Sequence, residues 1–106
     1  ERITLFSDLF FSPLHMSTLS KVLCELLDRK ISGIFNIGSR RGMSKAEFGL
    51  AVSNHLSLSA STVTIGSSTT VAGRCPRAKD LRLNVSKLET ALRRKMPTLI
   101  EEISKL

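Results

Sequence analysis

The chain has 106 residues, of which 42% are hydrophobic, and its 16 basic and 9 acidic residues give a formal net charge of +7. This length suits one modest hydrophobic core and is too short for two domains. No apolar run approaches the roughly 20 residues of a membrane-spanning helix, so we expect no membrane segment. The chain begins with Glu1 rather than methionine and shows no signal peptide, so we expect a segment of a longer, cytoplasmic protein.

The residue types that carry catalysis or bind metals are sparse. Cys24 and Cys75 lie far apart and form no CxxC motif, which favours a reduced protein over a disulfide framework. His15 and His55 have no nearby cysteine or carboxylate partner, so the sequence predicts no metal site. The chain has no tyrosine and no GxGxxG or Walker-type loop. We therefore expect neither a catalytic residue nor a cofactor-binding residue within it.

The first part of the chain alternates extended and helical signals. Residues 3–6 predict a short strand, and residues 11–14 predict a second extended piece because the residue before a proline avoids helical conformations. A helix is expected from an N-cap at Ser17 to about residue 30. Its apolar stripe consists of Leu19, Val22, Leu23, Leu26 and Leu27. The apolar residues 34–37, which lie between two glycines, predict a buried strand.

Three possible capping boxes mark the later helices. Ser44 and Glu47 form the first, which predicts a helix to about Leu56. The second is formed by Ser86 and Glu89. The third consists of Thr98 and Glu101, and its helix is expected to bury Leu99, Ile100 and Ile103.

A stretch rich in serine and threonine, residues 57–73, separates the first of these helices from the basic part of the chain. Alternation over residues 62–65 predicts a strand there. The remainder of the stretch lacks periodicity and predicts a mobile loop.

Half of the 16 basic residues lie between Arg74 and Lys95, so the positive charge is local. Within residues 74–87 there are five of them: Arg74, Arg77, Lys79, Arg82 and Lys87. Forked guanidinium groups on a loop constrained by proline suit a phosphate or diphosphate. The alternative is a solvated basic loop that leads into a helix. The aromatic content is only 5%, all phenylalanine, which disfavours stacking on nucleic-acid bases.

The order of these motifs resembles the C-terminal part of extended short-chain dehydrogenase/reductases, most closely the dTDP-4-dehydrorhamnose reductase type. The resemblance covers the chain from about Ile3 to Leu106. Its motifs are Phe6-Ser7-Asp8, Phe11-Ser12-Pro13-Leu14, Thr18-Leu19, Gly33-Ile34-Phe35-Asn36-Ile37-Gly38, Ser44-Lys45-Ala46-Glu47-Phe48 and the segment from Arg77 to Lys87. Two positions depart from the family pattern, since Ala78 replaces a usual proline and Asn84 a usual aspartate.

The resemblance implies an α/β fold, the C-terminal fragment of a Rossmann-type enzyme with about four helices and a few short strands. Residues 1–106 would form a single substrate-binding segment, and the N-terminal dinucleotide-binding domain would be absent. The parent protein would use NAD(P)H, whereas this fragment would bind no cofactor. By position, Arg77 would contact the diphosphate of a nucleotide-sugar substrate, with Arg74 and Lys79 as secondary charges. Ser12 and Pro13 would lie close to the active-site cleft.

Three functions follow as hypotheses. The first is the substrate-binding portion, inactive alone, of a nucleotide-sugar reductase of carbohydrate and cell-surface polysaccharide biosynthesis. The second is a non-catalytic regulatory or scaffold relative of the same family that binds another protein. The third, ranked last, is a nucleic-acid-binding module that uses residues 74–95. Without the Rossmann sheet beside residues 34–37, the fragment should expose apolar surface and self-associate.

Overall fold

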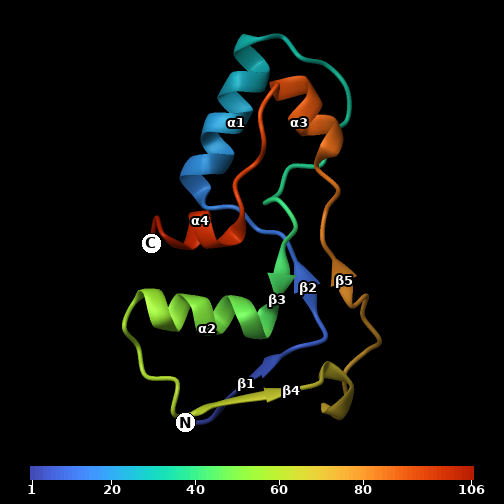
Figure 1. Cartoon of the computed structure of the whole chain (residues 1–106). Coiled ribbons are helices and arrows are strands. Elements are labelled where there is room, and N and C mark those ends of the chain that lie inside the picture. The colour runs from blue at the N-terminus through green and yellow to red at the C-terminus, as the bar shows by residue number, and fades with distance from the viewer.

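The computed structural model describes all residues from 1 to 106 and has an elongated outline, 48 × 33 × 16 Å. Figure 1 shows helices α1 and α3 at one end and the paired strands β1 and β4 at the other, with α4 and α2 between them. The helices are α1 (Met16–Asp28), α2 (Lys45–His55), α3 (Ser86–Leu92) and α4 (Leu99–Ile103). The strands are β1 (Ile3–Phe6), β2 (Phe10–Phe11), β3 (Met43–Ser44), β4 (Val63–Gly66) and β5 (Asp80–Leu81). The predicted α/β class, with four helices and a few short strands, is confirmed.

Two small sheets pair the first eleven residues with distant parts of the chain. Strand β1 runs parallel to β4, in a register that places Phe6 beside Gly66. In the second sheet β2 is the central strand, antiparallel to β3 and parallel to β5, with Phe10 beside Asp80. The short segment between β1 and β2 therefore faces the residues that follow β4 and those that precede β5.

The hydrophobic core lies between α1, α3 and the segment after α3. Its buried residues are Val22, Val85, Leu88, Leu92 and Met96, and Leu14, Leu26, Phe35 and Ile37 pack against them. The predicted apolar stripe of α1 is buried only in part, because Leu23 is 44% exposed and Leu27 is 75% exposed. The N-cap of the helix is His15, two residues before the predicted Ser17, and the His15 ring accepts the Ser17 N–H.

The predicted buried strand at residues 34–37 is wrong. The segment forms no strand and makes no backbone–backbone hydrogen bond, and Ile34 is 87% exposed. Its hydrogen bonds involve side chains instead: the Lys87 ammonium donates to the Ile34 carbonyl, and the Asn36 side-chain amide donates to the Asn84 carbonyl. A strand needs a second strand to satisfy its N–H and C=O groups, and none in these 106 residues lies alongside.

Two of the three predicted capping boxes are present. Ser44 with Glu47 starts α2, and Thr98 with Glu101 starts α4. The Ser86–Glu89 box is wrong, because Ser86 is itself the first residue of α3 and the Glu89 carboxylate accepts the Met96 N–H at 2.7 Å. Glu89 thus fixes the turn after its own helix.

Burial on α4 also differs from the expectation in one respect. Leu99 and Ile103 are buried, as predicted, whereas Ile100 is 60% exposed. The third buried residue on this short helix is Glu102.

The carboxylate of Glu102 joins α4 to the start of α1. Its side chain is 3% exposed and accepts hydrogen bonds from the His15 N–H at 3.0 Å and the Thr18 hydroxyl at 2.9 Å. It also pairs with the Lys105 ammonium at 2.7 Å. Burial opposes ionisation, but hydrogen bonds from Lys105, Thr18 and the His15 N–H together lower the pKa of Glu102 below its usual value.

Replacing Glu102 should therefore destabilise the fold. Glu102→Ala leaves the His15 N–H and the Thr18 hydroxyl without an acceptor, so we expect a loss of about 2–3 kcal/mol in the free energy of unfolding. Urea denaturation at neutral pH measures this loss. Asp28→Ala, an exposed carboxylate on α1, is the control and should change stability by less than about 0.5 kcal/mol. Equal losses for the two variants would contradict a structural role for Glu102.

The same carboxylate predicts a pH dependence. Because the folded-state pKa of Glu102 is below the usual value of 4.5, its stabilising contribution is complete above that pH and is lost as the pH falls through the folded pKa. The difference in urea midpoint between the parent chain and Glu102→Gln should thus shrink between neutral pH and about pH 3. A difference that does not change with pH would show that the charge is not what stabilises this contact.

The exposed edges and apolar side chains predict self-association of the isolated chain. Both sheets end in strands with one open edge, and Leu27, Ile34 and Leu81 are each at least 60% exposed. Light scattering in dilute solution should give a mass above the 11.7 kDa of one chain. A clean monomer would contradict this expectation.

Candidate functional site

Three of the five basic residues of the 74–87 segment line a common cavity of about 330 Å³. This cavity lies between the segment that joins β1 to β2, the turn after β4 and the loop before β5. Its lining residues are Leu9, Ser68, Thr69, Val71, Arg74, Cys75, Pro76, Arg77 and Lys79. We call it the Arg77 groove.

Strand pairing brings these separate segments together. The β1–β4 pair ends with Phe6 beside Gly66, so Asp8 and Ser68 follow the two strands on the same side. The β2–β5 pair begins with Phe10 beside Asp80, and the Phe10 N–H also donates to the Lys79 carbonyl at 2.8 Å. The loop before β5 therefore approaches the same short β1–β2 segment.

Asp8 fixes one wall of the Arg77 groove. Its carboxylate accepts hydrogen bonds at 2.9 Å from the Ser68 N–H, the Ser68 hydroxyl and the Ser67 hydroxyl. The Lys79 ammonium lies 3.8 Å from the same carboxylate. The Ser68 N–H is the main reason that the pKa of Asp8 falls to about 2; partial desolvation opposes this, and the two hydroxyls reinforce it. Asp8 is thus an anion at neutral pH that holds both the turn and Lys79.

The stretch expected to be a loop, the rest of residues 57–73, contains one regular element, the turn after β4. Residues 68–70 form a single 3₁₀ turn, and the Ser67 hydroxyl accepts the Thr69 N–H at its start. Because Asp8 and Ser67 satisfy the polar groups of this turn, its hydroxyl groups are held at the groove.

The three cations of the groove differ in how they are held. The Arg74 guanidinium lies over the Phe6 ring at 5.1 Å, and Lys79 pairs with Asp8. Arg77 makes no side-chain hydrogen bond and no ion pair with any residue of the chain. Its five N–H donors are therefore available to a ligand.

The other two basic residues of the segment are occupied within the fold. Arg82 forms a bidentate pair with Asp80, at 2.6 and 2.8 Å, and its guanidinium lies 4.7 Å from the centre of the Phe10 ring. Lys87 donates to the Ile34 carbonyl and lies over the Phe35 ring. These contacts stabilise the fold. Arg82 and Lys87 therefore differ in role from the three cations that line the groove.

Ser12 and Pro13 do not line the Arg77 groove. Ser12 is buried, and its hydroxyl accepts the Leu83 N–H at 2.9 Å while its carbonyl accepts the Ser39 N–H. The first bond joins the segment after β2 to the segment after β5, and the second joins it to the loop before β3. A role for Ser12 beside the active-site cleft stays a prediction.

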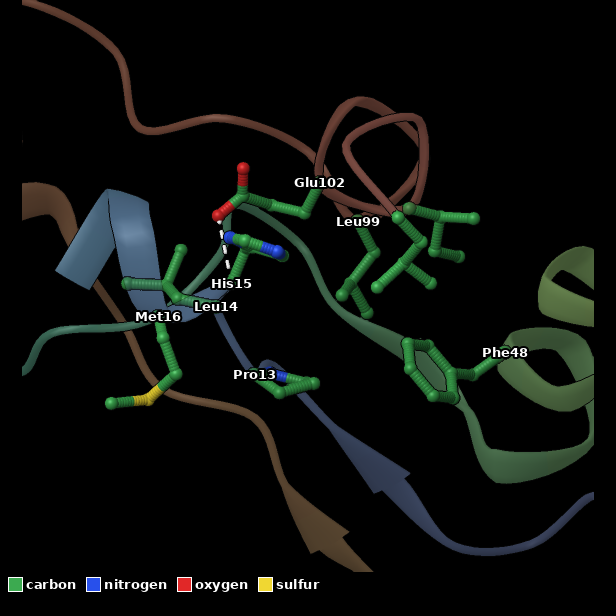
Figure 2. A pocket seen from close by; sticks show the side chains of 9 residues that line it. Pro13, Leu14, His15, Met16, Phe48, Leu99 and Glu102 are labelled. Carbon is green, nitrogen blue, oxygen red and sulfur yellow. Dashed lines mark hydrogen bonds between the residues drawn. The ribbon is translucent and has the colours of Figure 1, made fainter. Parts of the chain in front are cut away.

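Pro13 lines a different, mainly apolar pocket of about 350 Å³ between α1, α2 and α4. Figure 2 shows Pro13, Met16, Leu99 and Phe48 around this pocket, with the bond between Glu102 and His15 at its rim. Its role beside the cleft likewise stays a prediction.

Sequence reasoning missed the polar residues opposite the arginines, namely Asp8, Ser68 and Thr69. A signal for Asp8 existed, since it follows a short strand and lies within a motif of the resemblance. Nothing in the local pattern indicates that it binds Ser67 and Ser68, which lie some 60 residues away.

Other kinds of site find no support in the geometry. No group of three or more His, Cys, Asp or Glu side chains is arranged to hold a metal ion. Cys24 and Cys75 are both free and exposed. None of the helices has the length and apolar character needed to cross a membrane.

Comparison with solved structures identifies the fold. The dTDP-4-dehydrorhamnose reductase of Bacillus anthracis, in complex with NADP, matches with a TM-score of 0.87 and 18% identity over 99% of this chain and 37% of that chain. A dTDP-4-dehydrorhamnose reductase from Clostridium acetobutylicum matches with a TM-score of 0.83 and 17% identity, over 98% of this chain and 37% of that one. The dTDP-4-dehydrorhamnose reductase of Yersinia enterocolitica matches with a TM-score of 0.81 and 14% identity, over 98% of this chain and 36% of that chain.

The similarity lies in structure rather than in close sequence relationship. No family model and no curated protein matches the chain. The chain spans a little over a third of the length of the reductases that it matches. At the level of the fold, the resemblance to the C-terminal part of the extended short-chain dehydrogenase/reductases is confirmed.

Substitution of Asp8 should loosen the wall of the Arg77 groove. In Asp8→Asn one of the two carboxylate oxygens becomes an NH₂ donor, so the bonds now accepted at Oδ1 and Oδ2 cannot all be kept, and the charge that attracts Lys79 is lost. We expect the Ser68 amide hydrogen to exchange about tenfold faster with solvent, measured by hydrogen–deuterium exchange. Asp28→Asn is the matched control and should leave that exchange rate unchanged. An unaltered Ser68 rate in Asp8→Asn would contradict the proposed role of this carboxylate.

Proposed function

We propose that this chain is the substrate-side portion of an NAD(P)-dependent nucleotide-sugar reductase of the dTDP-4-dehydrorhamnose reductase type. The observation that carries the proposal is the unpaired guanidinium of Arg77, in a cavity with two further cations, on a fold shared with those reductases. A diphosphate is the part of a nucleotide sugar that such a cavity suits.

The groove offers the diphosphate three kinds of contact. Arg77 provides a planar fork that matches two phosphate oxygens, and Lys79 provides a point charge. Ser68 and Thr69 also line the groove, but their hydroxyl protons are engaged by Asp8 and by the Ser67 oxygen, so the donors to a diphosphate are the cations. Leu9 and Val71 add an apolar surface beside the charges. The groove thus supplies binding and orientation, and no acid–base group.

The chemistry belongs to a dinucleotide-binding domain outside these residues. The nucleotide-sugar reductase would move a hydride from NAD(P)H to a sugar carbon. The present residues include no tyrosine and no glycine-rich dinucleotide loop, so they do not suit the cofactor or the accompanying proton transfer. The chain alone should accordingly bind substrate weakly and catalyse no reduction.

A surface for the dinucleotide-binding domain lies along residues 34–37 and the exposed side of α1. Ile34, Leu23 and Leu27 are 87%, 44% and 75% exposed, and the backbone groups of residues 34–37 other than the Ile34 carbonyl make no hydrogen bond within the chain. A strand of a Rossmann sheet placed beside this segment would satisfy those groups and cover Ile34.

The structure gives the nucleic-acid alternative little support. The basic residues of 74–95 do not form one continuous surface, because Arg74, Arg77 and Lys79 line one groove and Arg94 and Lys95 line another that shares no residue with it. The phenylalanine rings near the first groove are covered by cations rather than free to stack on bases. The regulatory alternative retains the same fold and differs only in the chemistry of the other domain.

Arg77→Ala in the complete protein tests the proposal. Loss of a charge-assisted bidentate contact should raise KM for the nucleotide-sugar substrate about 10- to 100-fold, with little change in KM for NAD(P)H. Steady-state kinetics with each substrate varied in turn measures both constants. Arg2→Ala removes an exposed arginine outside the groove and serves as the control. An unchanged sugar-nucleotide KM in Arg77→Ala would overturn the assignment of the diphosphate to this groove.

A further inference from the structure

A second basic groove, with a volume of about 550 Å³, lies between α1, the segment after α3 and α4. Nine of its ten lining residues are not hydrophobic, and none is aromatic. They are Thr18, Lys21, Arg40, Arg94, Lys95, Met96, Pro97, Thr98, Glu101 and Lys105. We call it the Lys21–Lys95 groove. It shares no residue with the Arg77 groove.

Separate contacts of the fold bring its cations together. The Arg40 N–H donates to the Pro97 carbonyl at 2.8 Å, and Arg40 forms a parallel β-bridge with Thr98. The buried Glu102 of α4 joins Thr18 of α1 to Lys105, which lies just after α4. Cationic side chains from α1, from the loop before β3, from the segment after α3 and from the residues after α4 thus converge on one cavity.

The charges of this groove are only partly neutralised. Arg94 pairs with Glu25 at 2.8 Å and Lys105 pairs with Glu102 at 2.7 Å. Arg40 lies 3.8 Å from Glu89, a loose contact made through Nε, so its terminal nitrogens are unpaired.

The remaining polar groups of the groove can also donate. Lys21 and Lys95 take part in none of the ion pairs or side-chain hydrogen bonds of the chain. The lining carboxylate, Glu101, accepts the Thr98 N–H at 2.8 Å. The Thr98 hydroxyl accepts the Glu101 N–H, which leaves its own proton free to donate.

We propose that the Lys21–Lys95 groove is a binding site for a compact anion with two or more phosphate groups, separate from the substrate site. Unpaired lysine ammonium groups and a free arginine terminus are the donors that bind clustered phosphates. The volume falls within the range of small-molecule sites, about 300–1,000 Å³. Convergence from four segments suits one compact ligand, whereas a polymer is bound along a stripe with aromatic platforms, which this groove lacks. The proposal does not depend on the function of the Arg77 groove.

Inorganic tripolyphosphate is the probe that tests this site. We expect the amide NMR signals of the ¹⁵N-labelled chain to shift most at Arg40, Lys95 and Thr98 when tripolyphosphate is added at constant ionic strength. Calorimetry should then show that the double variant Lys21→Ala/Lys95→Ala binds tripolyphosphate at least about tenfold more weakly than the parent chain does. The charge-matched control, Arg2→Ala/Lys30→Ala, removes the same two positive charges elsewhere and should change the affinity by less than about twofold.

Several results would overturn the proposal. Equal weakening in both double variants would show a general charge effect rather than a site. Shifts confined to the Arg77 groove, or an absence of binding by the parent chain, would show that the second groove does not hold the anion. Tighter binding of a single-stranded oligonucleotide, with shifts spread over both basic regions, would indicate a polymer instead. The NMR mapping uses the unmodified chain, so it decides the location even if the Lys21→Ala/Lys95→Ala variant folds poorly.

Discussion

The pairing of the first eleven residues with two distant segments organises the candidate site. Strand β1 fixes the position of β4, and β2 fixes the position of β5, across separations of about 60 and 70 residues. Only the short link from β1 to β2 stands between the two sheets, and Asp8 lies in it. Gly42 supports the same arrangement from the other side, since its φ of +68° and the 2.4 Å that would separate an added Cβ from the Phe11 carbonyl oxygen exclude any larger residue. Without these pairings, neither the turn at 67–70 nor the loop at 74–79 would have a fixed position.

Within this arrangement, the ion pairs sort the basic residues by role. Arg82 and Lys87 have close partners that belong to the fold, whereas Arg74 lies over the Phe6 ring and Lys79 has only a loose contact with Asp8, at 3.8 Å. Arg77 has none. Net charge alone, at +7, does not make this distinction. Because a cation with an internal partner has less to gain from a ligand, the free guanidinium is the better guide to binding than the density of basic residues.

Local signals predicted the elements that depend on local physics. The capping boxes at Ser44 and Thr98 and the strand beginning near Val63 are properties of a few neighbouring residues, and they are confirmed. The errors come from long-range requirements. Residues 34–37 have the composition of a strand but lack a pairing partner, and Ser86 with Glu89 matches a capping box although Glu89 is engaged by the Met96 N–H. The three basic residues of the groove could be named from the sequence, whereas Asp8, Ser68 and Thr69 could not be placed opposite them without the strand pairing.

The most direct test of the central claim is to map where a nucleoside diphosphate binds on the unmodified chain. Titration of the ¹⁵N-labelled protein with dTDP should shift the amide signals of Ser68, Thr69, Arg77 and Lys79, whether or not the Lys21–Lys95 groove also responds. Weak binding, in the millimolar range, is sufficient because half of the proposed site lies in another domain. Shifts centred on Lys95 and Thr98 instead, or no shift at Arg77 at about 10 mM dTDP, would contradict the assignment of the Arg77 groove as the diphosphate site.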